Sequence, residues 1–183
     1  MISPAKGTLL IANPFLKDPN FMRTVILLCE HLAEGTFGFV LNKLFSKKLN
    51  ELVPELENLD FPVYQGGPVQ GDTLHFLHQQ PDLITGGQEI LKDVYWGGNF
   101  ETLQARLKNN DLDTDKIRFF IGYSGWTEGQ LDNEMKEDSW LTVSATRKLI
   151  FNTEPENVWK DSLNHLGGDY KMMVNYPLDP QLN

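Results

Sequence analysis

The sequence predicts a single domain of the α+β class. Short apolar or β-branched runs separated by glycine and proline are typical of strands, and they occur along most of the chain. Stretches with helical spacing are scattered among these runs without the regular alternation that a doubly wound sheet requires. A length of 183 residues suits one domain, and no repeat, low-complexity segment or Ser/Gly linker marks a boundary within 1–183.

The first strands are predicted from runs that are apolar throughout. Residues 7–12 indicate a strand that ends before Pro14, and residues 24–29 indicate a strand buried on both faces. A turn at residues 34–35 precedes residues 36–41, so these two runs are expected to form a hairpin. Further strands are expected at residues 63–64, 73–78, 90–96, 117–121 and 140–143.

Leucine or valine at positions 49, 52, 53 and 56 predicts a short amphipathic helix at residues 49–56, weakened by Pro54. Asn99 is a suitable N-cap for the helix that follows it. Thr127 with Gln130 has the spacing of a capping box.

A second capping-box pattern joins Thr153 to Glu156 and predicts a helix that buries Trp159 and ends at Gly167. Residues 169–183 contain Pro177 and Pro180 and are expected to form an extended tail.

The composition disfavours several classes of partner. The formal net charge is −9 and the pI is about 4.8, which opposes binding to the phosphates of nucleic acids. Cys29 is the only cysteine, so no disulfide framework is possible within the chain. The apolar run at residues 9–12 is too short for a signal peptide or a membrane span. These observations predict a cytoplasmic protein with no membrane association.

Residues 122–131 combine three glycines, two aromatic side chains and a helix-start pattern. Ser124 follows a predicted strand, as in a nucleophile elbow, but Trp126 occupies a position where that turn requires glycine. A structural turn from strand to helix is therefore favoured over a nucleophilic serine. Tyr123 and Trp126 are better candidates for the walls of a binding site.

The adjacent glycines Gly66 and Gly67 are not followed by the Gly-Lys-Ser/Thr of a phosphate-binding loop. They could expose backbone N–H groups to an anion or a peptide carbonyl. A tight connection between strands that needs a positive φ is the favoured interpretation.

The histidines and the cysteine do not indicate a metal centre. Cys29 and His31 share a strand face, but two ligands are too few for zinc. His75 and His78 are three apart on a strand and point to opposite faces. We therefore predict no metal and no cofactor, with His31 at a strand end as a hydrogen-bonding or functional group.

Polar and charged side chains supply the remaining candidates. Gln130 and Glu134 lie four apart on one helix face, which is more typical of a solvent-facing acidic surface than of acid–base catalysis. Arg23 precedes a buried strand, where a structural ion pair is favoured over an acidic ligand.

Several motifs, taken in order, resemble the AlgH/YqgE family of bacterial proteins over roughly residues 5–166. They are Gly7-x-Leu9-Leu10-Ile11-Ala12, Phe21-x-Arg23-Thr24-Val25, Glu30-His31, Gly38-x-Val40-Leu41-Asn42, Gly66-Gly67-Pro68-Val69, Leu77-His78, Gly122-Tyr123-x-Gly125-Trp126 and Gly129-Gln130-Leu131-x-x-Glu134. The resemblance implies an α+β fold with a bifurcated, mostly antiparallel β-sheet wrapped into a pseudo-barrel with flanking helices. It also implies a cytoplasmic bacterial protein, in a family of which some members are labelled as transcriptional regulators of exopolysaccharide production. The sequence has no helix-turn-helix and no basic helix, so direct DNA binding is discounted.

The sequence thus favours a non-enzymatic binding or regulatory protein with an unknown protein or small-molecule partner. The alternative is a hydrolase or transferase that uses His31 or Glu134 as a base, with no catalytic residue assigned. The binding candidates are Arg23, His31, Asn42, Gly66, Gly67, Tyr123, Trp126, Gln130 and Glu134. The two glycine-rich turns, His31, Trp126 and the Gln130/Glu134 helix face are expected to surround one cleft, within about 10 Å of a common point.

Overall fold

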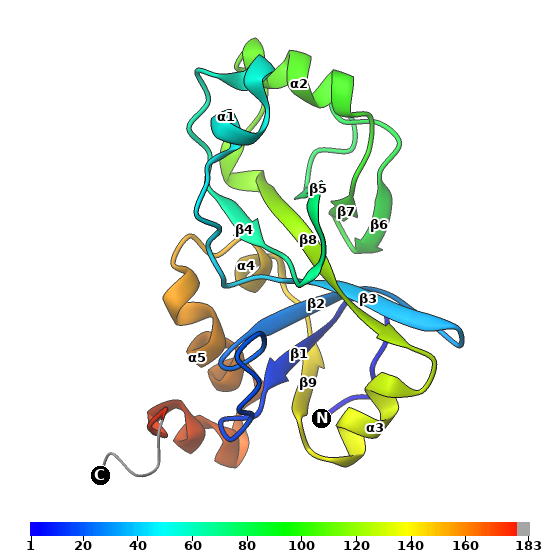
Figure 1. The fold of residues 1–183 in the computed structure, drawn as a ribbon, viewed down its shortest axis with the longest axis vertical. Coiled ribbons are helices and arrows are strands. Elements are labelled where there is room, and N and C mark those ends of the chain that lie inside the picture. The colour runs from blue at the N-terminus through cyan, green and yellow to red at the C-terminus, as the bar shows by residue number, and fades with distance from the viewer. Residues whose placement is uncertain (179–183) are drawn as a thin grey trace.

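The computed structural model describes residues 1–178 and shows a sheet that curls into a half-barrel, with helices packed against it (Figure 1). The strands within these residues follow the order β6-β7-β5-β8-β3-β2-β1-β9, and β4 pairs with β8 beside this path. Their bounds are β1 Thr8–Ala12, β2 Val25–Leu32, β3 Gly35–Val40, β4 Val63–Gln65, β5 Val69–His78, β6 Gln88–Leu91, β7 Val94–Trp96, β8 Ile117–Thr127 and β9 Trp140–Ser144.

The predicted α+β fold with a bifurcated, mostly antiparallel sheet is confirmed. Every strand pair is antiparallel except β4 with β8. The hairpin of β2 and β3 also forms as expected, with Ile26 opposite Val40.

The long strand β8 causes the bifurcation, and here the predicted turn after Ile121 is wrong. β8 continues to Thr127, and its partner changes from β5, up to Tyr123, to β3 from Ser124 onward. Gly122 lies at this change with a φ of 67°, which an L side chain rarely adopts. A glycine inside a strand can therefore bend the strand without ending it. Figure 1 shows β8 crossing between the upper part of the sheet and the lower part.

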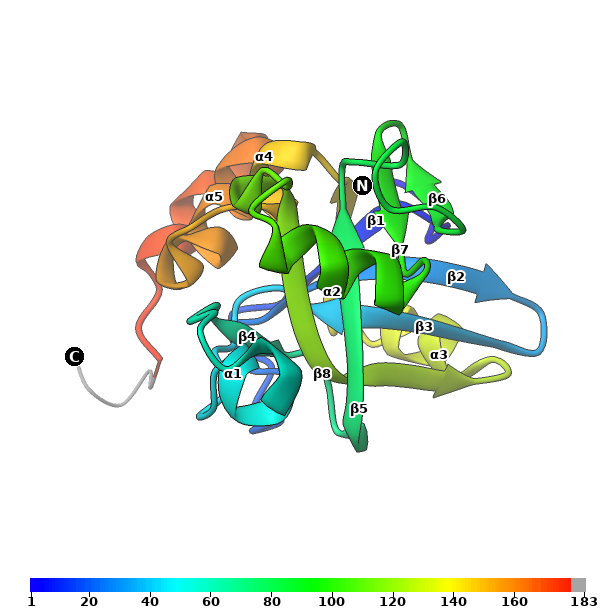
Figure 2. The same ribbon diagram turned by 90° about the horizontal axis from the view of Figure 1, so that it is seen from above.

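The helices cover three apolar clusters. Helices α4 (Arg147–Ile150) and α5 (Pro155–Leu166) cover the first cluster, which includes Trp159 and lies beside β1 and β2. Helix α2 (Phe100–Lys108) contributes Leu103 to the second. Helix α3 (Gln130–Lys136) contributes Leu131 to the third. Seen from above, α2 and α3 lie on opposite sides of the β3 and β8 strands (Figure 2).

Most helix ends match their predicted signals. Asn99 caps α2, accepting a hydrogen bond from the backbone N–H of Thr102, and Gly167 ends α5. Two predicted helix starts are wrong, the first by two residues and the second by one. Gly129, not Thr127, precedes α3, although the Thr127 N–H donates to the Gln130 side chain at 3.1 Å. Glu154, not Thr153, precedes α5, because Pro155 has the fixed φ that suits the first helical position.

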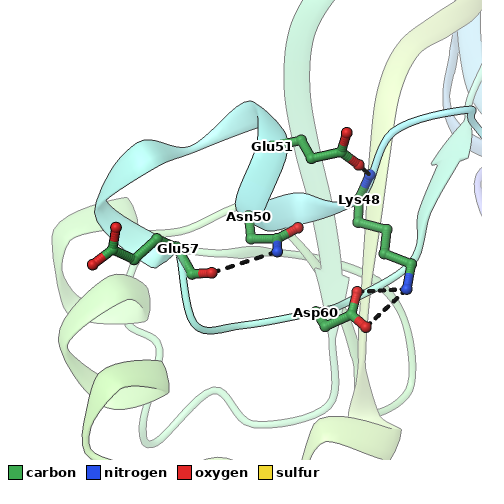
Figure 3. A network of polar contacts seen from close by, with 5 residues as sticks. All are labelled: Lys48, Asn50, Glu51, Glu57 and Asp60. Atoms are coloured by element: carbon green, nitrogen blue, oxygen red, sulfur yellow. Dashed lines mark hydrogen bonds and ion pairs between the residues drawn. The ribbon is translucent and has the colours of Figure 1, made fainter.

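The predicted helix at residues 49–56 is divided at Pro54, which has no N–H to continue the hydrogen-bond ladder. Helix α1 (Leu49–Leu52) is followed by a 3-10 helix, Pro54–Leu56. Figure 3 shows the polar contacts that hold this segment at the surface: the Lys48 N–H donates to Glu51, and the Lys48 ammonium lies 2.6 Å from Asp60. Both side chains of this ion pair are more than half exposed, so it adds little stability.

The expected extended tail at residues 169–183 is partly wrong. A 3-10 helix, Gly168–Asn175, packs beside α5, with Met173 and Val174 against the first core cluster. Apolar contacts with α5 therefore set its conformation, in spite of the two prolines that follow. A further 3-10 helix, Thr114–Lys116, precedes β8. Residues 179–183 of the expected tail lie outside the described residues.

Candidate functional site

A cavity of about 520 Å³ lies where the two parts of the sheet separate along β8. We call it the fork cavity. Four half-buried aromatic rings line it, from four different strands: Phe37 of β3, His75 of β5, Trp96 of β7 and Tyr123 of β8. Its volume is that of a small-molecule site.

Three contacts among the four rings of the fork cavity are steep, and the contact between His75 and Trp96 is tilted at 38°. The Phe37 ring lies 4.8 Å from Trp96 at 62° and 6.0 Å from Tyr123 at 77°, and the His75 and Tyr123 planes are perpendicular at 6.2 Å. Edge-to-face pairs of this kind are favourable and hold each ring in one orientation. The rings therefore form corners, with some of their faces turned in different directions around the cavity.

The charges at the fork cavity are negative. Glu30 and Glu34 line it, and neither forms an ion pair within residues 1–178. No lysine or arginine occurs among the described residues that line it. Burial lowers the pKa of His75, whose Nε2 is buried without a hydrogen-bond partner in the described structure, so this ring is neutral at pH 7.

Local sequence explains how the cavity stays open. Phe37 on β3 pairs with Gly125 on β8, so no side chain on β8 fills the space opposite the Phe37 ring. A Cβ on Gly125 would lie 3.3 Å from the Tyr123 ring, closer than most such contacts. Tyr123 itself is held by pairing with Val69 of β5. Of the sequence candidates, Tyr123 has its ring here, and Trp126 also lines the cavity.

The side chain of Trp126, however, points into the third core cluster. Its indole N–H donates to the Glu134 carboxylate at 2.9 Å, and the Trp140 indole donates to the same oxygen at 2.7 Å. Gln130 donates to the other Glu134 oxygen at 3.1 Å. The expected solvent-facing acidic face is therefore wrong for Glu134, which is half-buried and accepts hydrogen bonds from two buried indoles.

His31 lies near the same helix, at the end of the β2–β3 hairpin. Its Nδ1 is 2.6 Å from the Thr36 hydroxyl, and a small cavity of about 210 Å³ separates it from α3. This cavity shares Gly35, Thr36 and Thr127 with the fork cavity, so the two lie on either side of the β3–β8 pair.

Gly66 and Gly67 are packing residues, as the favoured interpretation predicts, but the reason is close approach. A Cβ on Gly66 would lie 2.4 Å from the Gly122 carbonyl oxygen, and one on Gly67 would lie 2.2 Å from the Tyr123 backbone. The Gly66 N–H donates to Ile121 and its carbonyl accepts from Val40, so neither group is available to a ligand. Ser124 is fully buried, and its hydroxyl also donates to the Gly66 carbonyl at 3.0 Å.

Arg23 and Asn42 lie at a second cavity, of about 600 Å³, beside α5. Asn42 bridges two backbone groups, since it accepts from the Val25 N–H and donates to the Arg23 carbonyl, both at 2.9 Å. The predicted ion pair of Arg23 is wrong within the described chain. Its guanidinium lies 4.1 Å over the Trp159 ring and donates to the carbonyls of Tyr176 and Pro177.

The expected single cleft is therefore divided into separate places. The bend at Gly122 and the start of α3 are joined by strand up to Thr127, and five residues of strand span roughly 17 Å. Gly66 packs at one end of this span, while His31, Gln130 and Glu134 lie near the other. Arg23 and Asn42 belong to the separate cavity.

Four of the residues that line the fork cavity are not among the candidates predicted from the sequence, namely Phe37, Trp96, Glu30 and Glu34, and His75 was a candidate only as a metal ligand. Aromatic residues at alternate strand positions were the available signal, but buried and cavity-lining rings have the same pattern. Within residues 1–178, no three His, Cys, Asp or Glu side chains are grouped to hold a metal ion. No helix of the described chain has the length and apolar character needed to cross a membrane.

Comparison with known proteins identifies the family. Residues 9–171 match the AlgH-like family model. The chain is 44% identical over 179 residues to a UPF0301 protein of Chlorobium luteolum, covering 98% of this chain and 95% of the relative. A UPF0301 protein of Cytophaga hutchinsonii is 42% identical, with coverage of 97% and 98%.

Two solved structures share the fold. The solution structure of the AlgH protein from Pseudomonas aeruginosa is 28% identical, with a TM-score of 0.74 and coverage of 97% of both chains. A crystal structure of a Corynebacterium diphtheriae protein is 21% identical, has a TM-score of 0.81 and covers 96% of this chain and 94% of its own. With this fold and the match over most of its length, the chain belongs to the AlgH-like family.

Proposed function

We propose that this protein is a non-enzymatic binding protein that takes an alkylammonium group of a small molecule into the fork cavity. The observation that carries the proposal is the combination of four aromatic rings, with three steep contacts among them, and two glutamates that have no ion-pair partner in the described chain.

The chemistry of the lining selects for positive charge. The negative face of an aromatic ring attracts a cation within about 6 Å, and the attraction grows when the cation is desolvated. Rings set at steep angles can contact several sides of one methylated ammonium group. Glu30 and Glu34 add Coulomb attraction, and neutral His75 adds no repulsion.

The candidates for catalysis support binding over the enzyme alternative. The Glu134 carboxylate accepts three hydrogen bonds, two of them from tryptophan indoles, so its oxygens are already occupied by groups of the protein. His31 contacts Thr36 and does not line the fork cavity. Neither residue therefore faces the same space as the aromatic rings.

We also propose that the protein is cytoplasmic. Any regulatory effect would depend on whether the ligand is bound, and not on direct contact with DNA. Burial raises the pKa of the single cysteine, Cys29, well above its usual range, so this thiol is not a reactive nucleophile. A net charge of −9 opposes phosphate binding.

Calorimetric titration with choline and with its neutral isostere, 3,3-dimethylbutan-1-ol, tests the proposal. Choline is expected to bind, and the alcohol to bind at least about tenfold more weakly, because a cation–π and Coulomb difference of roughly 1.4 kcal/mol corresponds to that factor. Trp96→Leu should remove choline binding, whereas Phe15→Leu, at an exposed ring outside the cavity, should not.

A second pair of variants tests whether negative charge at the fork cavity is required for binding. Glu34→Gln should weaken choline binding, while Glu101→Gln on the exposed face of α2 should leave it unchanged. Equal affinity for choline and the alcohol would contradict recognition of charge. No binding of either ligand by the folded protein would reject the fork cavity as an alkylammonium site.

A further inference from the structure

The cavity beside α5 has a chemistry opposite to that of the fork cavity. We call it the Arg23 pocket. Three cationic side chains line its volume of about 600 Å³, namely Arg23, Lys43 and Lys160, against one acidic side chain, Glu156. None of the three cations forms an ion pair within residues 1–178. On an acidic protein, this is a local concentration of positive charge, with Asp18 near Lys43 and Glu156 in the lining as the acidic groups beside it.

Arg23 is held rigidly at this pocket. Its backbone has a φ of 57°, unusual for a residue with a side chain, and the Asn42 amide fixes its carbonyl at 2.9 Å. The guanidinium carbon lies over the Trp159 ring, 4.1 Å from the ring centroid. Burial lowers the pKa of Arg23, and no carboxylate counters this effect. The cation is therefore oriented before any ligand arrives.

Backbone carbonyls near the end of the described chain accept hydrogen bonds from the Arg23 guanidinium. The Arg23 Nη2 group donates to the carbonyl oxygens of Tyr176 and, at 3.1 Å, Pro177. Residues 176–178 are exposed, and Tyr176 and Leu178 line the pocket. We call residues 176–178 the strap. Two neutral carbonyls compensate a guanidinium less well than one carboxylate, which accepts two parallel, charge-assisted hydrogen bonds.

We propose that the Arg23 pocket binds a small organic carboxylate and that the strap competes with this ligand for the Arg23 guanidinium. The cationic side chains would hold the carboxylate, and Trp159 and Val174 offer apolar surface to the body of the ligand. A planar carboxylate matches the guanidinium fork better than a tetrahedral inorganic anion with no apolar body. The proposal does not depend on the function assigned to the fork cavity.

Titration calorimetry with 3-phenylpropionate, on the full chain and on a chain that ends at Asn175 in a C-terminal amide, tests both parts. The amide is needed because Asn175 lines the pocket, and a free terminal carboxylate there would itself bind the Arg23 guanidinium. The shortened chain is expected to bind about tenfold more tightly, because apparent affinity scales with the fraction of molecules whose site is open. The neutral analogue 3-phenylpropionamide should not bind. Inorganic phosphate should bind more weakly than 3-phenylpropionate, and the reverse order would overturn the assignment to organic carboxylates.

Two charge variants locate the site. Lys160→Gln changes an exposed pocket residue and should weaken binding several-fold, whereas Lys92→Gln, exposed and outside the pocket, should not. Arg23→Gln should abolish binding in a protein whose circular dichroism is unchanged. Unaltered affinity in Arg23→Gln or Lys160→Gln would overturn the proposed site.

A measurement on the full chain keeps the competition falsifiable if the shortened chain fails to fold. In an NMR titration with 3-phenylpropionate, the backbone amide signals of Tyr176 and Leu178 should shift along with the side-chain signal of the Arg23 Nε–H. Shifts at Arg23 with no change at Tyr176 and Leu178 would overturn the role of the strap. No shift at any of them at saturating ligand would overturn the pocket itself.

Discussion

The indole nitrogen of Trp126 lies 2.9 Å from the Glu134 carboxylate, and this contact ties β8 to the helix that follows it. The same oxygen accepts from Trp140, and both indoles are at most 5% exposed. Glu134→Ala is expected to destabilise the protein by about 3 kcal/mol, because two buried donors lose a charged acceptor. Glu134→Gln, which keeps an acceptor oxygen, should cost about 1 kcal/mol. Urea denaturation of the two variants measures the difference, and equal costs would contradict this role.

Ser124 is expected to be structural. Ser124→Ala should cost about 1 kcal/mol, the usual contribution of one neutral hydrogen bond, because the Gly66 carbonyl keeps its bond from the Val40 N–H. Choline binding should not change. A fluorophosphonate probe should not label Ser124 in the folded protein, since its side chain is fully buried. Labelling at this residue would revive the hydrolase.

Trp159 is a core residue on α5. Trp159→Ala should destabilise the protein by about 3–5 kcal/mol, as expected for deletion of a large buried aromatic side chain. The indole is 3% exposed, donates to the Ala12 carbonyl at 2.9 Å and supports Arg23. Trp159→Phe should cost less because it keeps most of the apolar contact. An unchanged denaturation midpoint in the alanine variant would show that α5 does not depend on this contact.

Stability is expected to fall with acid because of His78. This ring is fully buried, its Nε2 lies 2.9 Å from the Gly97 carbonyl, and its Nδ1 accepts from the Gln80 N–H at 3.2 Å. Both contacts fit the neutral ring. Burial lowers the pKa of His78, an effect that the bond to Gly97 opposes only in part.

Protons therefore bind the unfolded chain more readily than the folded one as pH falls below the ordinary histidine pKa of about 6.5. The free energy of unfolding should decrease by up to about 1.4 kcal/mol per pH unit for this group, and His75 should add to it. Denaturation curves between pH 7 and pH 5 measure the slope, which should become smaller in His78→Gln. A slope that is identical in the variant would place the acid sensitivity elsewhere.

Duplex DNA should not bind the isolated protein appreciably at physiological salt. Acidic surface opposes the release of counter-ions that drives non-specific association. Fluorescence anisotropy with a labelled duplex checks this expectation. A sub-micromolar complex that weakens with salt would overturn it.

The positions of the strands could be predicted from the sequence better than the residues at which the strands end. Apolar runs such as residues 24–29 identify buried strands, because no other short element needs apolar side chains on both faces. The backbone conformation at Gly122 could not be predicted from the local sequence, because a glycine at the end of an apolar run is compatible with a turn and also with a bend inside a longer strand. The neighbours of Gly122, namely Gly66 and β3, decide between these outcomes, and they are distant in sequence.

The candidate sites show the same limit. Tyr123 could be selected because it lies in a glycine-rich motif, but Trp96 lies 27 residues earlier in the chain, and β5 brings it beside Phe37. Arg23 could be named as a binding candidate because it precedes a buried strand, but the groups that it contacts could not be predicted. The carbonyls that satisfy it belong to residues 176 and 177, whose position depends on the packing of the 3-10 helix against α5.

The pairing of β1 with β9 has a consequence for synthesis on the ribosome. Leu9 pairs with Val143, so the β1 edge stays open until more than three-quarters of the chain has emerged. The free edge of β3, on the other side of the β1–β2–β3 meander, can pair with β8 only after Ser124 and the residues that follow it have been synthesised. During translation this apolar meander therefore has two unsatisfied edges, which are templates for pairing with other chains. Nascent chains stalled before residue 117 should accordingly depend on chaperones, and chains released after residue 166, when α5 can cover the first core cluster, should not.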